Sequence, residues 1–174
     1  IIFSPYKSCT PILNINAKSL KILIINSAHI GDVVLSSYLL KLIKSKYPNA
    51  EIHFVLSSWT RMVLENNPRV KNIYIIDHWF YNRSKQNIFR KINRYFRTAV
   101  LEYNKIKKQK FDIALELNSH YPNLILYTKL LNIPIRIGYS TGGFGGLLTH
   151  RINYIPNDKH ELKIKLNLLK FISI

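Results

Sequence analysis

The chain has 174 residues, of which 47% are hydrophobic, so it can bury one good core. This length is too short for two full domains. Lysine and arginine number 26 against 9 aspartates and glutamates, which indicates an anionic partner: nucleic acid, a phosphorylated substrate or an acidic membrane surface. The single cysteine, Cys9, excludes a disulfide framework within the chain and any Cys-x-x-Cys metal site, as is typical of a reducing, cytosolic compartment. No apolar run approaches the ~18 residues of a membrane span.

Residues 1–19 precede the first regular pattern. They lack the basic start and the continuous apolar stretch of a signal peptide, and Pro5 and Pro11 interrupt them. Because the chain begins at Ile1 rather than methionine, we expect a processed, truncated or partial chain whose first 19 residues form a loosely structured extension.

From residue 20 onward, strand patterns alternate with helix patterns. Apolar runs bounded by turn residues predict strands over 21–26, 51–56, 70–77, 111–117 and 133–139. Apolar spacings of three and four predict helices over 32–46, 59–65, 84–109, 121–131 and from about residue 158 to the end. Such alternation implies an α/β, Rossmann-like domain over 20–174, with a mostly parallel sheet and helices on both of its faces.

Residues 20–34 are the most informative stretch. The apolar run 22–25 stops at a polar Asn-Ser and a helix opens soon afterwards, which predicts a central parallel strand. Ligands of open α/β sheets bind beyond the carboxyl ends of such strands. We therefore expect the site in this loop and at the start of the helix, and its candidate residues there are Ser27, Ala28, His29, Gly31 and Asp32.

Asp32 is the candidate general base, which would take the proton of an acceptor hydroxyl. The alternative is that it stabilises the first helical turn by charge or capping, an effect worth ~0.5 to 2 kcal/mol. Spacing alone favours the capping role, because acids are common at helix starts. His29 has a similar choice between donating to a substrate oxygen and being an ordinary loop histidine.

Three further residues are candidates for contact with the acceptor. Arg61, near the start of the short helix, and Arg136, at the end of the fifth strand, suit phosphate or acidic sugar groups, although solvated surface arginines are the alternative. His160 begins the last helix, where a role as a helix cap is the alternative.

The glycine-rich loop 141–146 predicts a mobile lid over the acceptor, with a plain flexible loop as the alternative. The six histidines are scattered, so we expect no metal site.

The helix over 84–109 carries most of the excess charge. Between Arg83 and Lys110 there are ten basic residues and one acid, Glu102. We expect the apolar stripe of this helix to pack on the sheet and its basic outer face to bind the protein to an anionic bilayer. Each Lys or Arg close to the membrane surface contributes ~1 kcal/mol to such binding. Nucleic acid is a less suitable partner, because the aromatic residues lie on the apolar face and do not alternate with the cations.

Four segments, taken in order, resemble the amino-terminal half of the bacterial heptosyltransferases of glycosyltransferase family 9. They are 21–34, with its Gly-Asp-Val helix start; 50–77, with two strands; 111–118; and 135–161, with Arg-Ile-Gly-Tyr and a later His-Glu. The resemblance implies one half of a GT-B-type enzyme, which transfers heptose or a related sugar with inversion onto a lipopolysaccharide core precursor. It also implies that Asp32 faces the sugar acceptor and is the base, and the family also places His or Glu at the position of His160.

The sequence departs from the family pattern in two places. Residues 117–120 read Leu-Asn-Ser-His where the family has Gln-Gly, and Glu116 replaces an aspartate. The family's nucleotide-sugar domain is absent from these 174 residues, so we expect them to be inactive alone, with the donor as a substrate and no cofactor. We expect a peripheral protein at the cytoplasmic face of the inner membrane, and the alternative function is a non-enzymatic module that binds phospholipid or nucleic acid.

Overall fold

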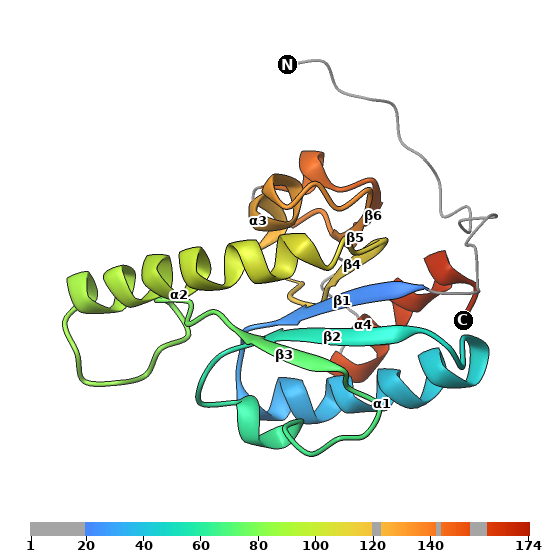
Figure 1. The fold of residues 1–174 in the computed structure, drawn as a ribbon, viewed down its shortest axis with the longest axis horizontal. Coiled ribbons are helices and arrows are strands. Elements are labelled where there is room, and N and C mark those ends of the chain that lie inside the picture. Colours follow the sequence, from blue (N-terminus) through green and yellow to red (C-terminus); the bar gives the residue numbers. More distant parts are fainter. Residues whose placement is uncertain (1–19, 120–122, 142–143, 154–159) are drawn as a thin grey trace.

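The computed structural model describes residues 20–119, 123–141, 144–153 and 160–174. Its centre is a six-stranded parallel sheet in the order β3-β2-β1-β4-β5-β6 (Figure 1). This order is that of a doubly wound Rossmann fold, so the predicted fold class is confirmed. The strands are β1 Lys21–Asn26, β2 Glu51–Leu56, β3 Asn72–Ile75, β4 Ile113–Glu116, β5 Ile135–Tyr139 and β6 His150–Ile152.

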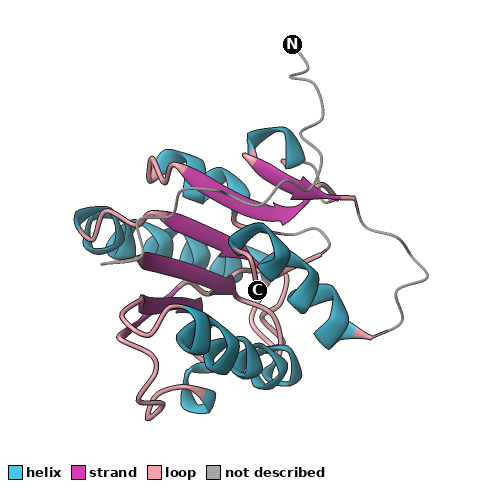
Figure 2. Ribbon diagram, turned by 90° about the vertical axis from the view of Figure 1, so that its right-hand side faces the viewer, coloured by secondary structure: helices cyan, strands magenta, loops and turns pink. Residues whose placement is uncertain are grey.

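Helices lie on both faces of the sheet (Figure 2). They are α1 Ile30–Lys46, α2 Ile88–Lys108, α3 Ile125–Leu130 and α4 Glu161–Leu169. Because successive strand residues point to opposite faces, Ile22 and Ile24 of β1 pack in the core with α1 and α4. Leu23 and Ile25 pack in a second core with α2 and α3. A continuous apolar run such as Ile22–Ile25 of β1 is typical of a strand that is buried on both sides.

The boundaries differ from the predicted ones mainly where elements are short. The predicted helix over 59–65 is a single 3-10 turn, Arg61–Val63. The sequence does not predict β6, because this strand has only three residues and two of them, His150 and Arg151, are polar. The predicted start of the last helix near residue 158 and the extension over 1–19 lie outside the described residues. No helix in the described ranges is long and apolar enough to cross a membrane.

The packing predicted for the long helix is wrong for much of its length. In α2 only Ala99 and Ile106 are buried, whereas Phe89, Phe96 and Val100 are 80%, 59% and 70% exposed. The physical reason is visible in Figure 1, where the amino-terminal half of α2 extends beyond the strands and has no sheet beneath it.

Candidate functional site

A cavity of about 240 Å³ lies at the carboxyl ends of the central strands. Its walls come from the segments that follow β1, β3 and β4 and from the first turns of α4, so four distant parts of the chain meet there. Two carboxylates, those of Asp32 and Glu161, and the ammonium of Lys165 are among the groups that line it. The full set of lining residues is Ala28, Asp32, Phe80, Tyr81, Leu117, Asn118, Ser119, Glu161 and Lys165. The cavity lies at the edge of the sheet where the sequence predicts a site, and most of its wall comes from residues that no sequence pattern indicated.

Asp32 is the third residue of α1, and its two carboxylate oxygens have different partners. Oδ2 accepts the backbone N–H of His29 at 3.3 Å, which is half of a capping box. Oδ1 lies 3.3 Å from the Lys165 ammonium, inside the cavity. The same side chain therefore caps the helix and lines the cavity, so capping does not exclude a chemical role.

Lys165 is the main residue that the sequence analysis missed. Its side chain is 3% exposed, and its ammonium lies between Asp32 and Oε2 of Glu161, which is 3.2 Å away. In sequence it forms an i,i+4 pair with Glu161, a spacing that normally marks the surface of a helix. A lysine so deeply buried needs carboxylate partners, and here it has two.

Tyr81 adds a phenol to the same cavity. Burial, and to a lesser degree the negative charges of Glu116 and Asp32, raise the pKa of Tyr81, so its hydroxyl stays protonated and can donate. The edge of the His29 ring packs against the Tyr81 ring, with the ring centres 5.5 Å apart. No sequence pattern marked Tyr81, because it lies in the irregular segment between β3 and α2.

Glu116, at the end of β4, is buried beside this cavity. Its carboxylate accepts the backbone N–H groups of Asn118 at 3.1 Å and Leu124 at 2.8 Å, and so fixes both ends of the segment between β4 and α3. Burial raises the pKa of Glu116 to about 7 despite these hydrogen bonds. Glu116 therefore holds the cavity wall in place.

The predicted residues of the β1–α1 loop lie at or beside the cavity. Ala28 lines it, and Ser27 is buried beneath, with its carbonyl accepting from Ser57 Oγ at 2.8 Å. The amide of Asn26 and the hydroxyl of Ser27 find no hydrogen-bond partner among the described residues. Gly31 is exposed, and a Cβ atom built on it meets nothing within 4 Å. The space before this helix is therefore open.

The two predicted histidines are both helix caps. His29 precedes α1, and its Nε2 lies 3.3 Å from the guanidinium of Arg83. His160 precedes α4, where its Nδ1 accepts the N–H of Leu162 at 3.3 Å. Neither lines the cavity, although each adjoins a residue that does or packs against one.

The two predicted arginines are not part of the cavity wall. The placement of Arg136 at the end of its strand is wrong: β5 begins at Ile135, so Arg136 lies at the amino end, where Nε donates to the Leu147 carbonyl at 2.8 Å. Arg61 is exposed and pairs with Glu65 at 3.0 Å. Neither guanidinium is brought to Asp32.

The glycine-rich loop is partly outside the described residues, so the predicted lid stays a prediction. Of its described residues, Phe144 lines a different cavity, between α2 and α3. Gly145 packs so closely that a Cβ atom would lie 2.6 Å from the Ser140 carbonyl oxygen, which explains this glycine by close approach. Within the described ranges, no group of three or more His, Cys, Asp or Glu side chains is arranged to hold a metal ion.

No protein-family model and no curated protein sequence matches this chain. Solved structures match its fold: a family 9 glycosyltransferase from Veillonella parvula (TM-score 0.65, 18% identity), the ADP-heptose heptosyltransferase II of E. coli (0.61, 20%) and the E. coli heptosyltransferase WaaC with ADP (0.63, 12%). These matches extend over 89%, 86% and 86% of this chain and over 41%, 40% and 45% of the matched chains. The chain thus spans less than half of their length, and over that part it has the Rossmann-like α/β fold of the family 9 glycosyltransferases.

Proposed function

We propose that this chain is the acceptor-binding half of a glycosyltransferase that moves a sugar from a nucleotide-sugar donor onto a hydroxyl group. The observation that carries the proposal is the cavity at the strand ends, where the Asp32 carboxylate lies beside a buried lysine and a protonated tyrosine. The buried polar side chains of Asn26 and Ser27, for which the described part of the chain offers no hydrogen-bond partner, support the proposal, because such groups cost stability and are typical of binding sites.

In the proposed reaction, Asp32 takes the proton of the acceptor hydroxyl as that oxygen attacks the sugar carbon and the nucleotide leaves. Asp32 must therefore exchange its contact with Lys165 for one with the acceptor. Glu161 makes this exchange possible, because it is already 3.2 Å from the same ammonium and can keep it paired. Lys165 is a positioning residue in this scheme, and the Tyr81 hydroxyl is a donor for an acceptor oxygen.

For the substrates, we propose heptose or a related sugar as the donor group and a lipopolysaccharide core precursor as the acceptor, at the cytoplasmic face of the inner membrane. The support is the order of the four family-like segments and the fold shared with two E. coli heptosyltransferases, one of them solved with ADP. A nucleotide-sugar donor would be held by a second domain, so the donor side of the reaction rests on that domain.

The decisive experiment replaces Asp32 by asparagine in a protein that carries these residues together with a nucleotide-sugar domain. Asparagine keeps the size and part of the capping ability and removes the base, so turnover should fall ~10²- to 10⁴-fold. Stability should fall by about 1–3 kcal/mol, because the buried Lys165 loses one of its two carboxylate partners. Glu65→Gln, an exposed carboxylate outside the cavity, is the matched control and should leave turnover unchanged. Near-normal turnover of Asp32→Asn, with a lowered thermal midpoint, would leave Asp32 only its capping role.

A second candidate function, a non-enzymatic module that binds anions, is favoured by the ten cations between Arg83 and Lys110. The two functions differ in what the cavity does. If the chain is only an anion-binding module, a sugar acceptor should bind equally well to the wild type and to Asp32→Asn. An acceptor that protects the described cavity residues from hydrogen exchange would instead favour the glycosyltransferase.

A further inference from the structure

An apolar groove of about 440 Å³ separates α2 from α3 on the face of the sheet opposite α1. Aromatic and aliphatic side chains from four segments form most of its wall, among them Trp79, Phe96, Val100, Leu126, Leu130 and Phe144. Every one of these side chains is at least partly exposed, and Leu130, Phe96 and Val100 are more than half exposed. A contiguous apolar surface of this kind is one on which another apolar surface can dock.

The apolar surface continues along α2 beyond the groove. Phe89, Phe96 and Val100 follow one another at spacings of seven and four, so they lie on one side of the helix. Phe89 is 80% exposed and lies at the amino-terminal end, which extends past the sheet (Figure 1). The row therefore runs from the groove, which Phe96 and Val100 line, to Phe89 outside it.

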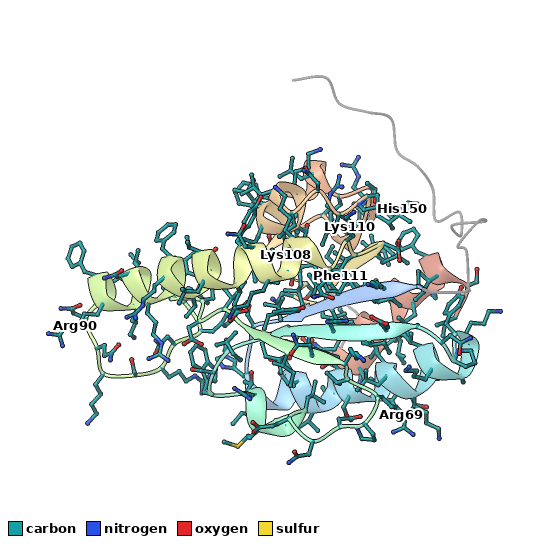
Figure 3. The ribbon with its side chains drawn as sticks, viewed as in Figure 1. Arg69, Arg90, Lys108, Lys110, Phe111 and His150 are labelled. Carbon is teal, nitrogen blue, oxygen red and sulfur yellow. The ribbon has the colours of Figure 1, made fainter. Side chains whose placement is uncertain are left out.

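Cations occupy the neighbouring side of the same helix. At 3.6 residues per turn, Arg90, Arg97 and Lys108 lie next to the Phe89–Val100 row and away from the sheet, and all three are exposed. Figure 3 labels Arg90 near one end of α2 and Lys108 near the other, so the positive side spans the helix. An exposed apolar row flanked by arginine and lysine is the pattern of a helix that lies in the plane of a membrane interface.

We propose that the groove and the exposed rows of α2 form a docking surface for an anionic bilayer, with the aromatic row inserted among the lipids and the basic side on their head groups. This goes further than attraction by a basic face, since the apolar part would persist when salt screens the charges. The proposal rests on the proposed function only for the identity of the acceptor, because lipid binding itself needs no catalysis.

Charge argues for a bilayer over other occupants of this surface. A second copy of the chain would bring the cations of one α2 close to those of the other, which is repulsive. Nucleic acid would satisfy the charge, but it would leave the Phe89–Val100 row in water. An anionic bilayer satisfies both rows at once.

The surface is also linked to the candidate site. Leu124 and Asn123 line the groove, and Asn118 lines the site cavity. Glu116 lies between them, with one oxygen on the Leu124 N–H and the other on the Asn118 N–H. A membrane-anchored acceptor held by α2 and α3 would thus meet the same segment that walls the cavity.

The first test measures binding of the full chain to vesicles of phosphatidylcholine and phosphatidylglycerol in equal parts, and to vesicles of phosphatidylcholine alone. Phe89→Ser with Val100→Ser should weaken binding to the anionic vesicles about tenfold or more, and Arg90→Gln with Arg97→Gln should weaken it to a similar degree. Matched controls lie on the α1 side, Val34→Ser with Met62→Ser and Lys41→Gln with Lys46→Gln, and should bind as the wild type does.

The second test uses the two tryptophans as reporters. Trp79 lines the groove. Trp59 lies between β2 and the 3-10 turn Arg61–Val63, and it lines neither the groove nor the site cavity. In a Trp59→Phe variant, emission from Trp79 should be quenched by lipids that carry a quencher on their acyl chains. In Trp79→Phe, the remaining Trp59 should not be quenched.

The proposal is overturned if the serine variants bind anionic vesicles as tightly as their controls, or if Trp79 is not quenched in bound protein. Preference for a duplex or single-stranded oligonucleotide over the anionic vesicles would also overturn it, in favour of a nucleic-acid surface. These outcomes are independent of Asp32, because Asp32→Asn should bind vesicles normally even where it abolishes turnover.

Discussion

The two faces of the sheet are covered to very different degrees. On one face, Leu39, Leu40 and Ile43 of α1 and Leu168 of α4 are fully buried against the strands. On the other, α2 is longer but buries only Ala99 and Ile106. Apolar periodicity therefore shows which residues share a side of a helix, but not whether the rest of the chain covers that side.

The two faces also differ in what holds their helices. A continuous apolar core holds α1, whereas the exposed half of α2 depends on a polar anchor. Asp77, after β3, is fully buried, and its Oδ2 lies 2.5 Å from Nε of Arg94 in α2, while Ser58 donates to both of its oxygens. We therefore expect the α2–α3 face to open locally more easily than the α1 face, and its stability to depend more on ligands and on pH.

The largest difference should come from matched leucines on the two faces. Leu40→Ala removes a fully buried side chain from α1 and should lower the free energy of unfolding by about 2–5 kcal/mol. Leu101→Ala, 57% exposed on α2, should change it by about 0.5 kcal/mol or less. Denaturant unfolding of both variants is the measurement, and equal losses would mean that α2 is covered in solution.

The pH dependence of stability should arise on the α2–α3 side. Burial raises the pKa of Glu116 from 4.5 to about 7, so its stabilising contribution is fully present below pH 4.5 and is lost as the pH rises to about 7. The whole change is about 3 kcal/mol at the scale of 1.4 kcal/mol per pKa unit.

His78, in the groove, acts in the opposite direction. Burial lowers its pKa from 6.5 to about 4, so its contribution is present above pH 6.5 and is lost as the pH falls to about 4. Unfolding midpoints measured from pH 4.5 to 7 should therefore show a more positive slope in Glu116→Gln than in the wild type. An unchanged slope would contradict the titration of Glu116 in this range.

Removal of the polar anchor should loosen α2 alone. Arg94→Met leaves the buried Asp77 carboxylate without its cation and should cost about 2–3 kcal/mol, less than for a fully buried pair because Arg94 is half exposed. Arg97→Met, on the outer side of the same helix, is the control and should cost little. Native-state hydrogen exchange should show faster opening of residues 88–98 in Arg94→Met, while α1 keeps its protection.

Two adjacent glycines offer the smallest effect and the cleanest contrast. Gly145→Ala would drive a Cβ atom to within 2.6 Å of the Ser140 carbonyl oxygen and should cost about 1–3 kcal/mol. Gly146→Ala meets no atom within 4 Å and should be close to neutral. Thermal midpoints of the two variants would distinguish a packed turn from a freely moving loop, for which both changes would be tolerated.

Much of the fold was predictable because it depends on local patterns. The five longer strands have four to six residues that are mostly apolar, and Asp32 lies where a buried strand gives way to a helix. Arg136 was misplaced: it is the middle residue of the predicted strand over 133–139, and because β5 begins two residues later it lies near the amino end.

The rest of the site could not be predicted because it depends on contacts between distant segments. Lys165 meets Asp32 across 133 residues of chain, and nothing in the local sequence of α4 distinguishes it from a surface lysine. Tyr81 and Asn118 enter the cavity from irregular segments, where no periodicity applies. Likewise, the exposure of α2 depends on how far the strands reach, which the helix sequence does not encode.

The parallel arrangement of the sheet also bears on how the chain reaches its fold. β1 is central and pairs with β4 on one side and β2 on the other. On the β4 side, the N–H of Lys21 donates to the side chain of Asp112, 91 residues away in sequence. On the other side, the connection from β1 to β2 runs through the whole of α1. No strand pair can form as a simple hairpin, so each pairing must close a long loop before it gains any contacts. During synthesis, β1 would therefore stay unpaired on the β4 side until Ile113–Glu116 has emerged. Refolding should accordingly be slow for a domain of this size, and chaperones that bind apolar extended segments should find one in residues 21–26.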